Sequence, residues 1–140
     1  VEHRITLLVE ILEASSLKSA DSNGLSDPYV KSYLEATNTF VGRPVQRITD
    51  NFKTQIVKKT LNPDFRGKHN QWRLTGLHED KLKDGNAKFV FRLMDWDMLS
   101  KDDELGIAVL HYPDIITDGE YNIKVQNSEK CKNATGTLKI

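Results

Sequence analysis

The sequence contains only one cysteine, Cys131, and no long run of apolar residues. A single cysteine excludes a framework of disulfides within the chain, and this usage favours a reducing compartment. No apolar stretch approaches the roughly eighteen residues of a membrane-spanning helix. The first residues also lack the basic-then-apolar order of a secretory signal peptide. We therefore expect a soluble chain located in the cytoplasm.

An excess of charge of either sign is also absent, because 20 Lys and Arg residues balance 20 Asp and Glu residues. Bulk attraction to nucleic acid or to an acidic membrane is thereby excluded, and any steering has to come from local patches. We expect a monomer with no nucleic-acid partner.

Motifs of the common enzyme classes are missing as well. The 4 histidines show no zinc-like spacing, and the sequence has neither a Gly-rich phosphate loop nor a Gly-x-Ser-x-Gly turn. Paired carboxylates can act as acid and base, but a larger cluster in polar turns suits a metal better than a catalytic pair. We predict that the domain itself is not an enzyme, which leaves room for an attached one.

The length of 140 residues fits one domain that can bury a hydrophobic core without disulfides. No internal repeat, low-complexity tract or linker divides the sequence. Strand signal begins within a few residues of Val1 and continues to Ile140. We therefore expect residues 1–140 to form a single domain excised from a longer protein.

Alternating apolar residues predict an all-β fold. Between Arg4 and Glu13 an apolar side chain occurs at every second position, the period of a strand with one buried face. Similar short runs are separated by Gly, Asn, Asp, Pro and Ser, whereas helical periodicity is limited to short turns near residues 78–83 and 113–116. Eight such strands predict an antiparallel β-sandwich. They are residues 4–13, 28–35, 52–58, 71–74, 88–94, 106–110, 121–125 and 135–140.

Two acidic stretches are the most informative feature of the sequence. One runs from Asp21 to Val30 and the other from Asp95 to Asp103, and each places carboxylates in a turn just outside an apolar run. If folding brings both turns to one end, the like charges repel unless a cation neutralises them. Ca²⁺ prefers six to eight oxygen ligands on adaptable loops. A single turn aspartate is more often structural, but five together predict a calcium site.

An EF-hand is the first alternative, because it also uses closely spaced aspartates. Counting twelve positions from Asp21, Asp95 or Asp97 gives neither Gly at the sixth position nor Glu at the twelfth. The flanking segments are also predicted strands, where an EF-hand needs helices. The ligands therefore have to come from separate loops.

The motifs around these loops resemble those of the C2 domain family. Residues 26–30, Ser-Asp-Pro-Tyr-Val, resemble the segment that leads from the first calcium-binding loop into the next strand, and Asn62-Pro63 resembles the family's Asn-Pro turn. The stretch from Phe89 through Asp103 to Gly106 is similar to the core strand, third loop and following strand. The resemblance implies a sandwich with calcium-binding loops clustered at one end. Because one strand precedes the first acidic turn, it also implies the circularly permuted type II topology.

The resemblance also implies a ligand set for two or three calcium ions. The side-chain ligands of calcium-binding members correspond to five aspartates here, with the Ser100 hydroxyl and several backbone carbonyls completing the shells. The implied metal site consists of Asp21, Asp27, Asp95, Asp97 and Asp103, Ser100, and the carbonyls of Ala20, Trp96 and Lys101. The long connection at residues 36–51 and the loose segment at residues 66–71 depart from the family pattern.

Two kinds of residue are candidates for lipid contact. Met98 and Leu99 lie at the expected tip of the third loop, where adjacent apolar residues suit insertion between lipid headgroups. The alternative is that either one packs back on a neighbouring loop. Lys31 and Lys58 belong to a set of basic residues that could engage phosphoinositide headgroups, whereas the alternative is ordinary solvated surface.

Two functions remain open from the sequence. The first is calcium-dependent binding of anionic phospholipid membranes, which would make the protein a peripheral membrane protein once calcium binds. The second is a protein-interaction module of C2 fold, in which calcium is structural or absent and the partner is another protein.

Overall fold

A computed structural model of the chain describes residues 4–19, 24–38, 43–115 and 117–140. Almost all of the regular structure is β. The elements are β1 (Arg4–Glu10), β2 (Glu13–Ser15), β3 (Pro28–Asn38), β4 (Arg43–Arg47), β5 (Phe52–Lys53), β6 (Gln71–His78), α1 (Glu79–Asp84), β7 (Lys88–Asp95), β8 (Asp103–His111), the 3-10 turn η1 (Tyr112–Asp114), β9 (Asn122–Lys124) and β10 (Thr137–Lys139).

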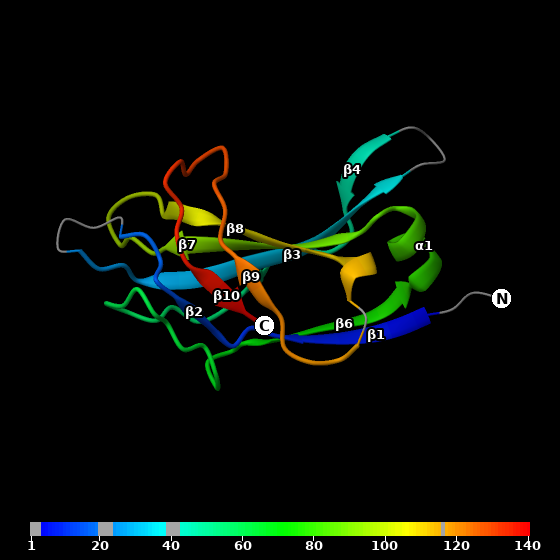
Figure 1. Ribbon diagram of the computed structural model, residues 1–140, viewed down its shortest axis with the longest axis horizontal. Helices are drawn as coiled ribbons and strands as arrows, with labels where there is room; N and C mark the ends of the chain where they lie inside the picture. Colours follow the sequence, from blue (N-terminus) through cyan, green and yellow to red (C-terminus); the bar gives the residue numbers. More distant parts are fainter. Residues whose placement is uncertain (1–3, 20–23, 39–42, 116) are drawn as a thin grey trace.

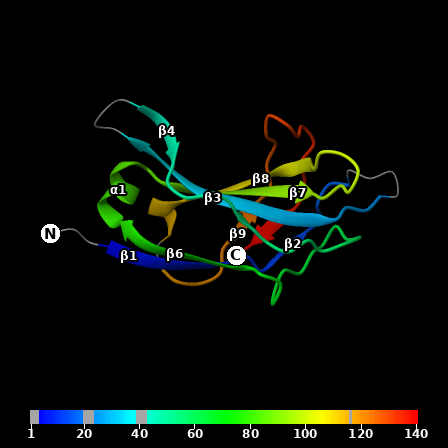
Figure 2. The same cartoon turned by 180° about the vertical axis from the view of Figure 1, so that it is seen from behind.

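The strands form two layers, as Figures 1 and 2 show from opposite sides. One layer has the order β4-β3-β7-β8, with β5 also pairing with β3, and the other contains β1-β6 and β2-β10-β9. All of these pairings are antiparallel. One strand segment, β1 continued by β2, precedes the first acidic turn, and the last strand pairs with β2. The predicted antiparallel sandwich is confirmed, and the strand order agrees with a type II arrangement.

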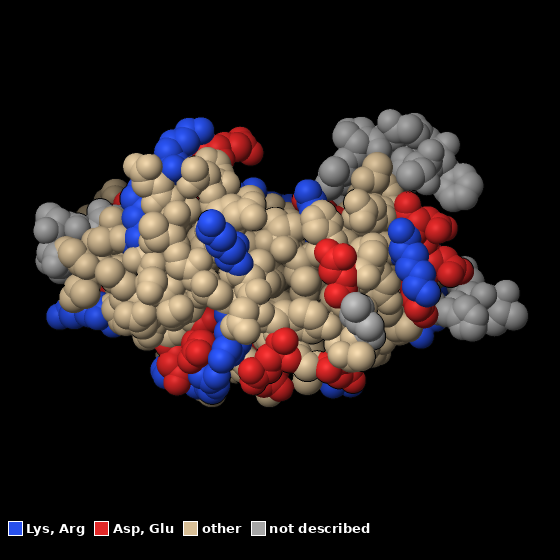
Figure 3. Space-filling model, viewed as in Figure 1, with Lys and Arg blue, Asp and Glu red and all other residues tan. Residues whose placement is uncertain are grey.

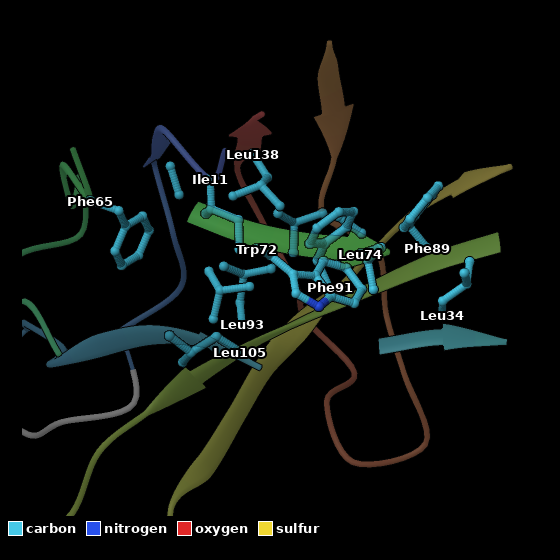
Figure 4. Close-up of a cluster of buried hydrophobic side chains, with 14 of the residues drawn as sticks. Ile11, Leu34, Phe65, Trp72, Leu74, Phe89, Phe91, Leu93, Leu105 and Leu138 are labelled. Atoms are coloured by element: carbon cyan, nitrogen blue, oxygen red, sulfur yellow. The ribbon is translucent and has the colours of Figure 1, made fainter. Parts of the chain in front are cut away.

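The core lies between the layers because successive side chains of a strand point to opposite faces. In β3, Val30 and Leu34 are fully buried, whereas Lys31 between them faces the opposite side of the sheet. Figure 4 shows Trp72 of β6 among the core side chains of the facing sheet. The ring of Trp72 meets those of Phe89 and Phe91 edge to face, with centroids 5.9 and 6.4 Å apart. Aromatic rings prefer such arrangements, which add to the stability gained by burial.

The predicted strand at residues 52–58 is wrong beyond its first two residues. Only Phe52 and Lys53 form a ladder with β3. Immediately afterwards the Val30 N–H donates to the Thr54 hydroxyl at 2.9 Å instead of to a backbone carbonyl. The segment still follows β3, because the Val57 N–H donates to the Pro28 carbonyl at 2.9 Å. The Thr54 N–H still donates to the Val30 carbonyl at 3.0 Å, so the side chain replaces one of the two backbone hydrogen bonds of this residue pair, and the regular ladder ends there.

The long connection at residues 36–51 contains a strand that the sequence did not predict. Residues 43–47 form β4, which pairs with the second half of β3. Its pattern carries no clear alternation of apolar residues, because it lies at the edge of the sheet. The short turn expected near residues 78–83 is a helix at Glu79–Asp84 that buries Leu82. Among the described residues, no helix is long and apolar enough to cross a membrane.

Candidate metal centre

Three of the predicted aspartates are brought together by strand register. Asp95 is the last residue of β7, and it pairs with Pro28 at the start of β3 and with Asp103 at the start of β8. Asp27 immediately precedes β3. These strand ends, together with the loop after β7, lie at the end of the molecule opposite to the start of β1 and to α1 (Figures 1 and 2). The fold therefore places Asp27, Asp95 and Asp103 on one rim.

The carboxylate of Asp95 is buried at this rim, with only 2% of the residue exposed. Its Oδ1 accepts a hydrogen bond from the Asp27 N–H at 2.8 Å. The Asp27 carbonyl in turn accepts from the Trp96 N–H at 3.0 Å. A buried carboxylate is stable only when it is hydrogen-bonded, paired or coordinated to a metal. The backbone of Asp27 and the side chain of Asp95 thus hold the two acidic stretches against each other.

A third segment reaches the same rim from the connection between β5 and β6. The Lys59 N–H donates to Asp27 Oδ1 at 2.7 Å. Lys59 has a φ of 57°, in the left-handed region that non-glycine residues rarely adopt. Next to it, the Lys58 ammonium lies 5.3 Å from the centroid of the Trp96 ring, a cation–π distance. Residues 58–59 therefore connect the first acidic stretch to the loop after β7.

The loop after β7 curls around the carboxylate of Asp97. Its Oδ1 accepts from the Leu99 N–H at 2.9 Å and its Oδ2 from the Ser100 hydroxyl at 2.8 Å. The backbone N–H of Leu99 and the hydroxyl of Ser100 lower the pKa of the Asp97 carboxyl, because they stabilise its ionised form. Each carboxylate oxygen keeps a second lone pair for another partner. Asp97 can therefore shape the loop and still present oxygen to a cation.

Asp102 is a residue of this loop whose role the sequence did not reveal. Its Oδ1 accepts from the Asp97 N–H at 2.9 Å, and its Oδ2 accepts from the Tyr29 hydroxyl at 2.5 Å. Burial, and then the neighbouring Asp102 carboxylate, raise the pKa of the Tyr29 hydroxyl. The sequence offered only an extra aspartate beside Asp103, a signal that does not distinguish a cation ligand from a hydrogen-bond acceptor.

The remaining predicted site residues lie in or next to these segments. Ser100 and Lys101 belong to the exposed part of the loop after β7, and Trp96 is partly buried at its start. Asp21 and Ala20 lie outside the described residues. Within residues 4–19, 24–38, 43–115 and 117–140, no group of three or more His, Cys, Asp or Glu side chains is close enough to hold a metal ion.

The chemistry of the donor set nevertheless fits calcium. The described donors at the rim are carboxylate, hydroxyl and carbonyl oxygens, whereas zinc sites are built mainly from Cys and His. Asp27 and Asp95 are fixed by the fold, and Asp97 and Ser100 lie on an exposed loop. Calcium sites accept such adjustable loops. A complete shell would need the loop side chains to converge with the first acidic stretch.

The tip of the loop after β7 presents the two most exposed large apolar side chains among the described residues. Met98 is 74% exposed and Leu99 is 90% exposed. This exposure argues against the alternative that either side chain packs back on a neighbouring loop. Exposing two adjacent apolar side chains is unfavourable in water unless they have an apolar partner.

Basic side chains gather on the outer face of the β3 layer. Lys31 of β3 lies directly across from Lys53 of β5 and Arg92 of β7. The pKa of Lys31 is lowered by burial, and then by the positive charges of Lys53, Arg92 and Arg47. The guanidinium of Arg47 stacks 3.9 Å from the centroid of the Tyr33 ring. We call this set of Lys31, Lys53, Arg47 and Arg92 the basic face.

One buried carboxylate balances part of the basic face. Arg92 Nη1 donates to Glu104 at 2.7 Å, and Glu104 also accepts from the Ser128 hydroxyl. Elsewhere the two signs of charge are mixed, and Figure 3 shows Lys and Arg side chains beside Asp and Glu along its lower edge. Positive charge is therefore concentrated locally although the chain carries no net charge.

Comparison with known proteins agrees with this fold. The family model described as "C2 domain" matches residues 5–127. Tricalbin-1 of Saccharomyces cerevisiae is 30% identical over 131 residues, which are 91% of this chain and 9% of that protein. Synaptotagmin-C of Diplobatis ommata is 36% identical over 104 residues, or 74% of this chain and 16% of that protein. The chain thus spans a small part of each of these relatives.

Solved structures show the same fold. A C2 domain of plant Extended Synaptotagmin 1 superposes with a TM-score of 0.70 at 18% identity, covering 96% of this chain and 88% of that one. A structure that holds two C2 domains of Extended-Synaptotagmin 2 gives 0.64 at 18% identity, covering 96% of this chain and 38% of that one.

An antiparallel sandwich with acidic loops at one rim defines a β-sandwich binding module. This chain belongs to the C2 domain family. C2 domains are non-enzymatic binding modules, and those of synaptotagmin-like proteins generally bind phospholipid membranes.

Proposed function

We propose that this domain binds anionic phospholipid membranes in response to calcium and so brings an attached protein to the membrane. The observation that carries the proposal is the rim at which strand register gathers Asp27, Asp95 and Asp103. Beside it stand the exposed apolar side chains of Met98 and Leu99. Acidic oxygens and apolar side chains at one end suit a metal and a bilayer, respectively.

The ligand set that we propose comes from both acidic stretches. Asp27 and Asp95 would hold the cation from the fixed strand ends, and Asp97, Ser100 and Asp103 would hold it from the loop after β7. The protein's remaining ligands would be the carbonyls of Trp96 and Lys101, together with Asp21 and the carbonyl of Ala20 from the first acidic stretch. Five aspartates provide about ten carboxylate oxygens, which two or three ions needing six to eight ligands each would share.

The oxygens of the protein leave the coordination shells of these ions incomplete, so lipid oxygens can occupy the remaining positions. When bound, calcium supplies positive charge and open coordination positions for lipid phosphate or carboxylate oxygens. Without it, Asp27, Asp95, Asp97 and Asp103 present negative charge that repels anionic headgroups. The aspartates of the rim therefore act as an electrostatic switch whose sign depends on calcium.

The basic face supports a second contact with the same membrane. Lys31 stands on β3 two residues beyond Tyr29, on the side of the sheet that faces away from the core. Gathering Lys31, Lys53, Arg47 and Arg92 raises the local positive potential, which attracts anionic headgroups such as those of phosphoinositides. Lys58 lies nearer the rim, above the Trp96 ring. We propose both Lys31 and Lys58 as lipid contacts.

Vesicle co-sedimentation tests the proposed function directly. The domain is expected to pellet with vesicles of phosphatidylserine and phosphatidylcholine when calcium is present, and to remain in the supernatant after a chelator is added. Vesicles of phosphatidylcholine alone serve as the matched control, since they lack net charge. Equal pelleting with and without the chelator would favour the alternative, a protein-interaction module of C2 fold in which calcium is structural or absent.

Removing the apolar loop tip is expected to weaken vesicle binding without affecting calcium uptake. Burying a large apolar side chain contributes about 1.5–3 kcal/mol. The Met98→Ser and Leu99→Ser double variant should therefore bind anionic vesicles at least about 10-fold more weakly. Its calcium isotherm without lipid should match that of the wild type, because neither side chain offers a ligand.

The control for that variant is Leu8→Ser on β1, where the replaced side chain is 51% exposed but lies away from the rim. Leu8→Ser should bind vesicles like the wild type. If the double variant and Leu8→Ser bind vesicles with the same affinity, the loop tip does not enter the membrane.

A further inference from the structure

The hydrogen bonds of Asp102 point to a task different from that of the other loop aspartates. The last rung between β7 and β8 pairs Asp95 with Asp103, so residues 96–102 form the loop between these strands. Asp102 immediately precedes Asp103 of this last pair. Its Oδ1 accepts a hydrogen bond from the Asp97 N–H at 2.9 Å. The side chain thus closes the neck of the loop where the backbone ladder ends.

The other oxygen of Asp102 ties the loop to a different strand. Its Oδ2 accepts from the Tyr29 hydroxyl at 2.5 Å. Tyr29 is 7% exposed and pairs with Met94 of β7 within the continuous ladder between β3 and β7. The position of the Tyr29 hydroxyl is therefore fixed by the pairing of β3 with β7. Through it, Asp102 connects an exposed loop to the scaffold.

We propose that Asp102 and Tyr29 form a clamp that fixes the loop at residues 96–102 in its ligand-presenting shape before a cation arrives. The inference rests on the proposed function, in which Asp97, Ser100 and Asp103 hold calcium. Asp102 is a positioning residue in this arrangement, because its two oxygens join the Asp97 N–H to the Tyr29 hydroxyl and so hold the loop to β3. Hydrogen-bond partners of this kind orient the groups that do hold the metal.

The benefit of the clamp is pre-organisation. An open loop would have to lose conformational freedom each time it bound a cation, which weakens binding. Loss of an orienting partner commonly lowers metal affinity about 10- to 100-fold. Since Asp97 and Asp103 flank the clamp on either side, freeing the loop should affect both at once.

Three variants separate a clamp from a direct ligand. Asp102→Ala removes both hydrogen bonds, and Tyr29→Phe removes one without changing any charge. Asp102→Asn loses the negative charge, but its amide can still accept from the Asp97 N–H and donate to the Tyr29 oxygen. Asp118→Ala is the charge control, since this exposed residue lies in the connection between η1 and β9.

Titration calorimetry with calcium chloride, without lipid, measures the effect on affinity. We expect calcium to bind about 10-fold more weakly to Asp102→Ala and several-fold more weakly to Tyr29→Phe. Asp102→Asn and Asp118→Ala should stay within about 3-fold of the wild type. If Asp102→Asn is as weak as Asp102→Ala while Tyr29→Phe is normal, Asp102 is a ligand and the clamp is rejected.

Amide hydrogen exchange in the presence of a chelator tests the clamp without any metal. The Asp97 amide should exchange about 10-fold faster or more in Asp102→Ala and Tyr29→Phe than in the wild type, since opening exposes it to solvent. Amides in the middle of β7 should be unchanged, which shows that the variants are folded. Unchanged exchange at Asp97 would overturn the clamp. Absence of calcium uptake by the wild type would instead overturn the proposed function.

Discussion

Replacing Asp95 and Asp97 together by asparagine is expected to abolish calcium-dependent binding to anionic vesicles. Each change removes one negative charge and one strong oxygen ligand, and calcium affinity follows the number of charged ligands. We expect affinity for calcium to fall about 100-fold or more. The fold should survive, because asparagine at position 95 retains a side-chain oxygen that can accept from the Asp27 N–H.

Co-sedimentation and thermal unfolding both report on this double variant. Wild-type protein at a calcium concentration about 100 times its dissociation constant should gain about 2.7 kcal/mol of unfolding free energy, whereas the variant should gain little. Asp114→Asn with Asp118→Asn is the matched control, since it makes the same charge change at exposed positions near η1. If the Asp95/Asp97 variant still sediments only when calcium is present, the rim is not the calcium site.

Replacing Phe91 by alanine is expected to cause the largest loss of stability. Phe91 is fully buried, and its ring meets that of Trp72 edge to face across the two layers. Truncating a buried phenylalanine costs about 3–5 kcal/mol, because the transfer energy is lost and a cavity remains. For a domain of this size, the midpoint of thermal unfolding should fall by about 10 °C or more.

Urea unfolding followed by tryptophan fluorescence measures that loss. Leu99→Ala is the control, since the same class of side chain is removed from a position that is 90% exposed. Its unfolding free energy should stay within about 0.5 kcal/mol of the wild type. An equal loss in both variants would mean that Phe91 does not form part of the core shown in Figure 4.

Much of the fold could be predicted because strand patterns are local. Residues 4–10 alternate because one face of β1 meets the core, whereas residues 28–35 and 88–94 are apolar runs that are buried for most of their length. All three predicted segments are strands, apart from a break between Glu10 and Glu13. The Asn-Pro turn and the acidic stretches similarly indicated the C2 family before any contact was known. The lengths of the strands were less predictable. The ladder between β3 and β5, for example, ends where the Thr54 hydroxyl binds the Val30 N–H, and this contact depends on the neighbouring strand.

The type of ligand atom at the candidate site could be predicted from the sequence, whereas the grouping of side chains from different strands could not. Two stretches of aspartate predicted a cation site on the condition that folding brings both turns to one end. The basic face, by contrast, combines Lys31, Lys53, Arg47 and Arg92 from four strands, and their proximity depends on register. The edge strand β4 gave no sequence signal, because an exposed edge needs no apolar alternation.

By itself, the sequence determined that this protein is a sandwich of short strands with carboxylates in the turns, because periodicity and turn residues are properties of neighbouring positions. Tertiary structure alone decided that Asp95 is buried against the backbone of Asp27, whereas Asp102 joins the Tyr29 hydroxyl to the neck of a loop. The Asp27–Asp95 and Tyr29–Asp102 partners lie 68 and 73 residues apart along the chain. Such pairs are set by strand order and register, which no local pattern encodes.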